Sequence, residues 1–192
     1  MIPMIEEELH SHRQVLDTTI RQSASLINDV ATAIVTCFKK GNKLLLCGNG
    51  GSAADAQHVA AEFVNRFRLV RGVMPALALT TDTSIITSVA NDSAFEDVFA
   101  RQVEALAVGG DILVGISTSG GAANVLRALD VARARGVTTV GFTGEKGRET
   151  LATKCDYTLV VPSADTARIQ ECHGFVWHVI CGIVEGAMFP QG

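Results

Sequence analysis

Short apolar segments, each followed by glycine, threonine, serine or proline, alternate along this chain with segments of helical spacing. The apolar segments cover residues 43–47, 76–79, 112–116, 137–142 and 157–161. Continuous apolar runs are typical of strands that are buried on both faces, as in a parallel sheet covered by helices. The alternation therefore predicts a three-layer α/β/α domain with about five parallel strands.

The intervening segments predict the outer layers of helices. Residues 6–40 contain neither proline nor glycine, and their apolar side chains recur near helical spacing until Gly41-Asn42 ends the helix. The last helix is predicted from about Thr166 to Met188, and two others end near residues 67 and 135. Because no repeat or linker interrupts the pattern, we expect one domain over residues 1–192, with residues 1–40 as an N-terminal helical extension.

Composition limits the partners and the compartment. The net charge is −4 and no basic run exceeds Lys39-Lys40, which argues against direct nucleic-acid binding. The apolar stretches are shorter than the ~20 residues that cross a bilayer. Glu6, Glu7 and Glu8 stand where a signal peptide would be basic, so we expect a cytoplasmic protein without a membrane segment. Five scattered cysteines without a Cys-x-x-Cys spacing indicate reduced, buried thiols.

Oligomer formation is indicated by the same composition. Charged residues make up 19% of the chain, below the roughly 25% of typical soluble chains. Much of the surface is therefore apolar enough to be buried against another subunit.

Two loops rich in glycine and hydroxyl residues lie between a predicted strand and a helix. They are Gly48-Asn49-Gly50-Gly51-Ser52 and Ser117-Thr118-Ser119-Gly120-Gly121. Such loops turn backbone N–H groups toward an anion at a helix N-terminus, although they can also simply cap a helix. The first loop also matches Gly-x-Gly-x-x-Ala, but no acidic residue ends the next strand, which argues against a nicotinamide cofactor. Hydroxyls without a lysine favour the phosphomonoester of a small molecule.

These residues resemble the sugar isomerase (SIS) domain family, and within it the phosphoheptose isomerases. The resemblance spans nearly the whole chain and is carried by four strings: residues 48–58 (GNGGSAADAQH), Ala90-Asn91-Asp92, Ser117-Thr118-Ser119-Gly120 and Arg168-Ile169-Gln170-Glu171. It implies a flavodoxin-like SIS fold with a long N-terminal helix. Gly121-Ala122 departs from the usual Asn-Ser of the family, so one phosphate-directed hydroxyl is missing.

The resemblance also implies site residues. The implied substrate contacts are Asn49, Gly50, Gly51, Ser52, Glu62, Asn91, Asp92, Ser117, Thr118, Ser119 and Gln170. The implied metal site, with one zinc ion per subunit, consists of His58, Glu62, Gln170 and His178, and Glu62 and His178 are the implied catalytic pair for proton transfer.

The spacing of these residues is compatible with such a site. His58 and Glu62 lie four residues apart and share a helix face, although such pairs also occur on solvated helices. His178 lies in an apolar segment, where a buried core histidine is the ordinary alternative. Gln170 and His178 are separated by ~12 Å of helix, so we expect one of them to come from a neighbouring subunit. Whether Glu62 is mainly base or ligand stays open, because a zinc-bound carboxylate is a weaker base.

The function predicted from the resemblance is isomerisation of D-sedoheptulose 7-phosphate to D-glycero-D-manno-heptose 7-phosphate through an enediol. In family members this reaction leads to nucleotide-activated heptose for surface glycans such as lipopolysaccharide. The alternative is a non-catalytic SIS protein, either a replication-initiator-associating adaptor or a sugar-phosphate sensor. SIS relatives usually form dimers or tetramers, so we expect a homotetramer with active sites near subunit interfaces.

Overall fold

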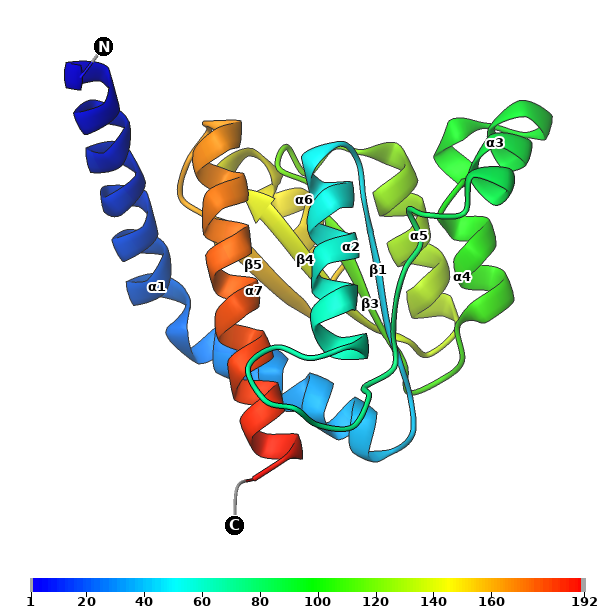
Figure 1. The fold of residues 1–192 in the computed structure, drawn as a ribbon. Coiled ribbons are helices and arrows are strands. Elements are labelled where there is room, and N and C mark those ends of the chain that lie inside the picture. The colour runs from blue at the N-terminus through cyan, green and yellow to red at the C-terminus, as the bar shows by residue number, and fades with distance from the viewer. Residues whose placement is uncertain (1, 191–192) are drawn as a thin grey trace.

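The computed structural model describes residues 2–190 and contains a sheet of parallel strands between layers of helices (Figure 1). The strands are β1 (Leu44–Gly48), β2 (Ala76–Ala78), β3 (Ile112–Ile116), β4 (Thr138–Gly144) and β5 (Tyr157–Val161). They are hydrogen-bonded in the order β2-β1-β3-β4-β5, and every pair is parallel. The predicted three-layer architecture with about five parallel strands is confirmed.

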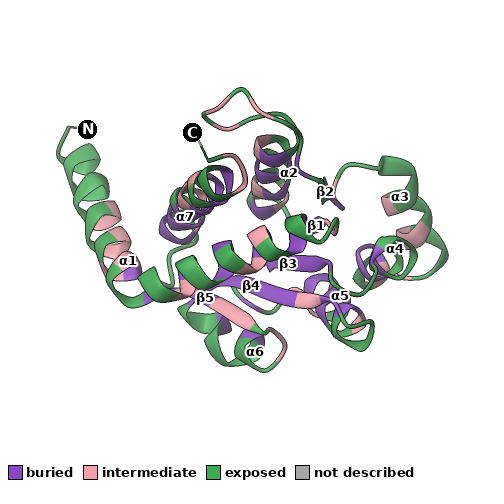
Figure 2. Cartoon of the chain, turned by 90° about the horizontal axis from the view of Figure 1, so that it is seen from below, coloured by how far each residue is buried: buried purple, intermediate pink, exposed green. Residues whose placement is uncertain are grey.

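Two apolar cores lie on opposite faces of the sheet, because successive strand residues point in opposite directions. Leu44 and Leu46 of β1 enter the core beneath α1 (Ile2–Lys39), α2 (Gly51–Val64) and α7 (Thr166–Met188). Leu45 and Cys47 enter the core formed with α4 (Ala100–Leu106), α5 (Ala123–Ala134) and α6 (Arg148–Ala152). Strands β1 and β3 are buried at every residue between these two groups of helices (Figure 2).

The structure adds a segment that the alternating pattern did not predict. Between β2 and β3 lie α3 (Thr83–Asp92), the 3₁₀ helix η1 (Phe95–Asp97) and α4. Helix α3 has no fully buried residue, but Ile86, Val89 and Ala90 are partly buried against the core on the α4–α5 side of the sheet. It stands apart from α2 and α7 in Figure 1.

Two helix boundaries also differ from the prediction. Helix α1 begins at Ile2, and α2 ends at Val64 rather than near residue 67. The early end of α2 has a local cause, because the Arg71 guanidinium donates to the carbonyl oxygens of Glu62 and Phe63 at 2.7 Å each. These last carbonyls of a helix have no partner within the helix.

The N-terminal half of α1 extends beyond the rest of the molecule (Figure 1). Its exposed apolar side chains include Ile2, Met4 and Ile5, which are 65–71% exposed. This observation agrees with the apolar surface that the composition predicts. Among residues 2–190, no helix combines the length and the apolar character needed to cross a bilayer. Four of the five free cysteines are buried and Cys155 is half-buried, as predicted.

The strand order places the two glycine-rich loops together. Strand β1 pairs with β2 on one side and with β3 on the other, so the chain order reverses between β1 and β3. In their register Gly48 lies opposite Ile116, and each is the last residue of its strand. Ligands of open parallel sheets bind where such a reversal opens a crevice at the carboxyl edge. The fold therefore brings both loops to the expected ligand-binding edge.

Candidate functional site

The first loop connects β1 directly to the N-terminus of α2. Asn49 and Gly50 form the turn, and the helix begins at Gly51. A Cβ atom at Gly51 would overlap the side-chain amide of Gln170, so glycine leaves room for this amide in its present position. Ser52 is 4% exposed within the first turn of the helix. The implied substrate residues 49–52 and Gln170 are therefore neighbours.

The second loop is held against the end of β4. The Ser117 N–H donates to the carbonyl of Phe142 at 2.9 Å, and the Gly144 N–H donates to the carbonyl of Thr118 at 3.0 Å. Gly120 has φ +71°, and a Cβ atom there would overlap the backbone of Gly147. This close packing fixes the direction in which the loop enters α5.

A pair of amides links the two loops. Asn49 and Asn124 exchange two hydrogen bonds of 2.9 Å each between their side chains. Asn124 is 3% exposed and lies in the first turn of α5. Sequence reasoning did not select Asn124, although it lies just beyond the serine loop. Ala122 is the N-cap residue of α5, and its side chain makes no capping hydrogen bond to the helix. This agrees with the hydroxyl that is missing here from the family pattern.

A histidine–carboxylate cluster lies further along α2 and α7. The Nε2 atoms of His58 and His178 are 2.9 Å apart, and His58 Nε2 lies 3.7 Å from Oε1 of Glu62. One ligand atom from each of the three side chains lies within 4.8 Å of the other two. The His58 side chain is 51% exposed and that of Glu62 is 20% exposed, so the cluster is open to a small molecule.

The donor set of this cluster fits a divalent metal ion. Two imidazole nitrogens and one carboxylate oxygen are the three protein ligands found in many zinc sites that keep a position for substrate. The 2.9 Å between the two Nε2 atoms is the distance of an N–H···N hydrogen bond, which a bound ion would replace with two metal–nitrogen bonds. The three groups therefore form a possible metal-binding site within a single chain.

The other predicted residues are not all at this cluster. Gln170 contacts Gly51, which precedes His58 by seven residues on the same helix, so its amide lies at the first-loop end of the α2–α7 pair. His178 joins His58 and Glu62 within one chain, so it is not required from a neighbouring subunit. Asn91 and Asp92 lie on the exposed helix α3, where the Asn91 amide donates to Asp92 at 2.7 Å.

Asp55 is a further polar residue that the sequence reasoning did not select as a site residue. It lies one turn before His58 on α2, and its Oδ2 atom is buried without a hydrogen-bond partner among the described residues. Burial raises the pKa of Asp55, and the charge of His58 opposes that shift. Its position four residues after Gly51 was the sequence signal that could have identified it.

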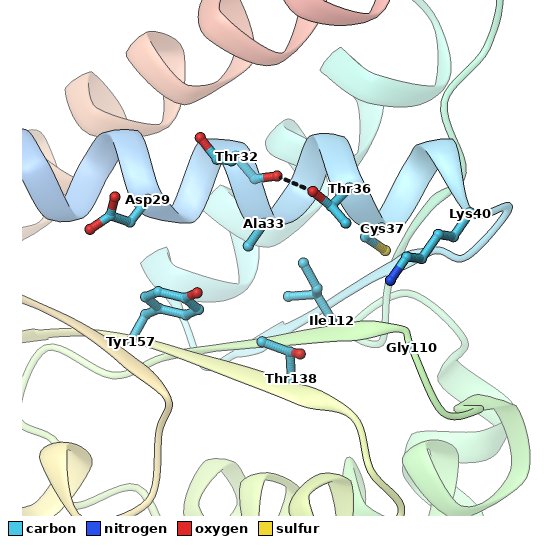
Figure 3. A pocket seen from close by; sticks show the side chains of 10 residues that line it. All are labelled: Asp29, Thr32, Ala33, Thr36, Cys37, Lys40, Gly110, Ile112, Thr138 and Tyr157. Carbon is cyan, nitrogen blue, oxygen red and sulfur yellow. Dashed lines mark hydrogen bonds between the residues drawn. The ribbon is translucent and has the colours of Figure 1, made fainter.

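The larger hollows of the surface lie elsewhere. One of about 510 Å³ is at the opposite edge of the sheet, between α1 and the first residues of β3, β4 and β5 (Figure 3). The hydroxyls of Thr32 and Thr36, which line it, donate to carbonyls of their own helix at 2.8 and 2.9 Å. Two of the hydroxyls that line this hollow are therefore already bonded within α1.

Comparison with known proteins agrees with this geometry. The profile of the SIS domain family matches residues 9–144. The chain belongs to the SIS domain family. It is 55% identical over 185 residues to the phosphoheptose isomerase of Roseiflexus sp., covering 96% of this chain and 93% of the relative. The phosphoheptose isomerase of Pelobacter propionicus is 50% identical over 189 residues, covering 98% of this chain and 100% of the relative.

Solved structures give the same assignment of this SIS protein. The phosphoheptose isomerase of Neisseria gonorrhoeae superposes with a TM-score of 0.90 at 38% identity. That match covers 96% of this chain and 98% of the other. Within the SIS domain family, the chain therefore belongs with the phosphoheptose isomerases, as its sequence motifs predicted.

Proposed function

We propose that this SIS protein is a phosphoheptose isomerase that converts D-sedoheptulose 7-phosphate to D-glycero-D-manno-heptose 7-phosphate. The observation that carries the proposal is the convergence of His58, Glu62 and His178 beside two phosphate-type loops, in a chain about half identical to proteins with that name. We place the enzyme in the cytoplasm, where it would supply precursors of nucleotide-activated heptose for surface glycans.

The phosphate group is the natural ligand of the loop after β3. Ser117, Thr118 and Ser119 offer hydroxyls there, and the open N-terminus of α5 offers N–H groups with a positive dipole end. Ser52 and the start of α2 face the same edge of the sheet. With the phosphate held there, the sugar chain would extend along the α2–α7 pair toward His58 and His178.

Isomerisation moves one hydrogen between neighbouring carbons. We assign Glu62 as the base that removes a proton from C1 of the open-chain ketose, which leaves an enediolate with the electron pair delocalised onto the oxygen at C2. Reprotonation at C2 and transfer of the hydroxyl proton from the C1 oxygen to the C2 oxygen give the aldose. We assign His178, 2.9 Å from His58, as the acid that serves the oxygens.

We propose zinc as the ion that His58, Glu62 and His178 hold, with the amide of Gln170 as a fourth ligand. A zinc ion here would supply Lewis-acid stabilisation of the developing oxygen charge. Because ~12 Å of helix separates Gln170 from His178, this fourth ligand would come from a neighbouring subunit.

The assembly proposed is a homotetramer of single SIS domains with active sites near the subunit interfaces. Asn91 and Asp92 support this arrangement, because they are exposed on α3, which lies apart from α2 and α7 (Figure 1). We propose that these two residues contact the substrate bound by a neighbouring subunit. The exposed apolar side chains at the start of α1 offer a surface for the same assembly.

A non-catalytic adaptor or sensor of the SIS type is not favoured. Such a protein needs the loops that bind a sugar phosphate, but it does not need a carboxylate and an imidazole at hydrogen-bond range of the reacting carbons. This chain retains both Glu62 and His178, and the two relatives compared above carry the name of the enzyme.

The decisive experiment measures conversion of sedoheptulose 7-phosphate by the purified chain, before and after chelation and with zinc restored. Glu62→Gln and His178→Ala are each expected to reduce turnover by about 10²–10⁴-fold, the usual contribution of a general acid or base. Glu149→Gln, on the exposed surface of α6, is the matched control and keeps full turnover. Specific binding of the sugar phosphate without turnover under any metal would contradict the proposal and favour a sensor.

A further inference from the structure

The segment that follows α2, residues 65–72, crosses to the C-terminal half of α7 and is called the strap below. It carries Phe67, whose ring stacks on the imidazole of His178 with centroids 5.6 Å apart and an angle of 20° between the planes. The same ring lies against Gly182, one turn further along α7, where an added Cβ atom would be 3.7 Å from it. Phe67 therefore forms one wall of the histidine–carboxylate cluster.

Glu185 holds the strap in this position. Its carboxylate accepts hydrogen bonds from the backbone N–H groups of Phe67, Arg68 and Leu69 at 3.2, 2.9 and 3.2 Å. The Glu185 side chain is 3% exposed. Burial alone would raise the pKa of this carboxyl, but the backbone donors and Arg71 outweigh it and hold the pKa below its usual value. The residue that stacks on His178 is thus fixed through its own backbone.

Arg71 connects the strap to the other helix of the cluster. Its Nε donates to Glu185 at 3.1 Å, and Nη2 donates to the carbonyl oxygen of Glu62 at 2.7 Å. Its side chain is 2% exposed, and a cation at this end of α2 also complements the negative end of the helix dipole. One buried ion pair therefore ties the backbone of Glu62 to α7 and to the strap.

We infer that Phe67 is a positioning residue, which holds the His178 ring with Nε2 facing His58 and Glu62, and that the Arg71–Glu185 pair anchors it. A histidine on an exposed helix face rotates among several rotamers, and most of them would turn Nε2 away from the cluster. A flat ring stacked on the imidazole restricts that rotation without forming a bond to either nitrogen. Groups that orient a metal-binding histidine strengthen metal affinity and activity together. The inference rests on the proposed metal-dependent isomerase.

The test compares Phe67→Leu with the wild-type chain at full length. Loss of the flat ring is expected to weaken zinc binding about tenfold, measured by competition with a chromophoric chelator, and to lower kcat about tenfold. KM for sedoheptulose 7-phosphate is expected to change less than about twofold, because the phosphate loops are untouched. Phe67→Tyr keeps the ring and restores both values. Val70→Ala, at a strap residue that is 90% exposed, is the matched control and changes neither.

Several outcomes would overturn the positioning role. Unchanged zinc affinity and kcat in Phe67→Leu would do so, and so would a loss that Phe67→Tyr fails to restore. A wild-type chain that binds no zinc would overturn it together with the proposed metal site. Zinc binding that weakens in Phe67→Leu, in a chain that does not convert the heptose phosphate, would support the positioning role and reject only the isomerase.

The anchor has a separate test. Arg71→Lys keeps the positive charge but cannot reach both Glu185 and the carbonyl of Glu62, because lysine lacks the forked guanidinium. Zinc affinity is expected to fall severalfold, in the same direction as in Phe67→Leu. A variant that unfolds at lower temperature but binds zinc with wild-type affinity would show that Arg71 stabilises the fold without serving the site.

Discussion

Two carboxylates of this protein, Asp111 at the amino edge of the sheet and Glu62 near the end of α2, have opposite surroundings. At the amino edge, the carboxylate of Asp111 is fully buried and accepts hydrogen bonds from the backbone N–H groups of Lys43 and Val108 at 3.0 and 2.9 Å. It also pairs with the Lys43 ammonium at 2.6 Å. Glu62, in the last turn of α2, lies 3.7 Å from His58, which is beyond hydrogen-bond distance, and its side chain is 20% exposed.

This difference separates polar groups that hold the fold from polar groups that are free to act. A buried carboxylate with every lone pair occupied stabilises its surroundings but cannot accept a proton from a substrate. Hydrogen bonds hold the pKa of Asp111 below its usual value although burial pushes it upward. Glu62 and His178 have capacity left for a ligand, so chemistry is possible at the histidine–carboxylate cluster on α2 and α7.

The largest expected effect on stability comes from the amino edge. Asp111→Asn places an amide NH₂ against the donors of Lys43 or Val108, and it removes the charge that pairs with the ammonium. Such a change at a buried pair costs about 3 kcal/mol of unfolding free energy, measured by urea titration. Glu62→Gln, in the same assay, is expected to change stability by less than about 0.5 kcal/mol. Equal losses of unfolding free energy in the two variants would contradict the distinction between the two carboxylates.

Two glycines with the same backbone geometry sharpen the comparison. Gly120 at the carboxyl edge and Gly136 at the amino edge both have φ +71°, but only Gly120 packs against the backbone of Gly147. Gly136→Ala is expected to cost ~1 kcal/mol for the left-handed conformation alone. Gly120→Ala adds a clash between backbones and is expected to cost ~1–2 kcal/mol more, as urea titration would show. Similar losses would mean that the serine loop tolerates displacement.

A buried histidine beneath the site gives a prediction in pH. His173 is fully buried, and burial lowers its pKa to about 4, although its contact with the Thr143 carbonyl opposes the shift. In the unfolded chain His173 binds a proton near pH 6.5, whereas in the folded chain it does so only near pH 4. The free energy of unfolding therefore falls as the pH drops from 6.5 toward 4. Between pH 7 and pH 5 the loss is about 2 kcal/mol.

Comparison of wild type with His173→Leu tests this assignment. Urea titrations at pH 7 and pH 5 are expected to show the loss only in the wild type, because leucine has no proton to bind. Asp111 and Glu185, whose pKa values are lowered, lose their contributions only at more acidic pH. A loss of the same size in both proteins would place the pH dependence in other groups.

The fold and the local motifs could be predicted from the sequence, whereas the distances between helices could not. Continuous apolar runs such as residues 112–116 predicted buried parallel strands correctly, since that pattern depends only on local burial. Helix α3 was not predicted because its apolar face is short: Ile86, Val89 and Ala90 stand at helical spacing but are only partly buried against the core. The contact between His58 and His178 within one chain was not predicted either. It depends on α2 and α7 lying side by side, and the spacing of residues within one helix does not indicate this.

The smallest effect is expected at the amide pair that joins the two loops. Asn124→Ala removes both hydrogen bonds to Asn49, at 2.9 Å each, and leaves the first loop free to shift relative to the second. If both loops bind the phosphate, a loss of about 1 kcal/mol of binding free energy raises KM for the sugar phosphate about fivefold. Because Glu62 and His178 are not displaced, kcat is expected to stay within about twofold of wild type. Asn28→Ala, on the exposed face of α1, is the control. A fall in kcat without a change in KM would instead indicate that Asn124 helps to position the reacting carbons. Its position between the two glycine-rich loops argues against that role.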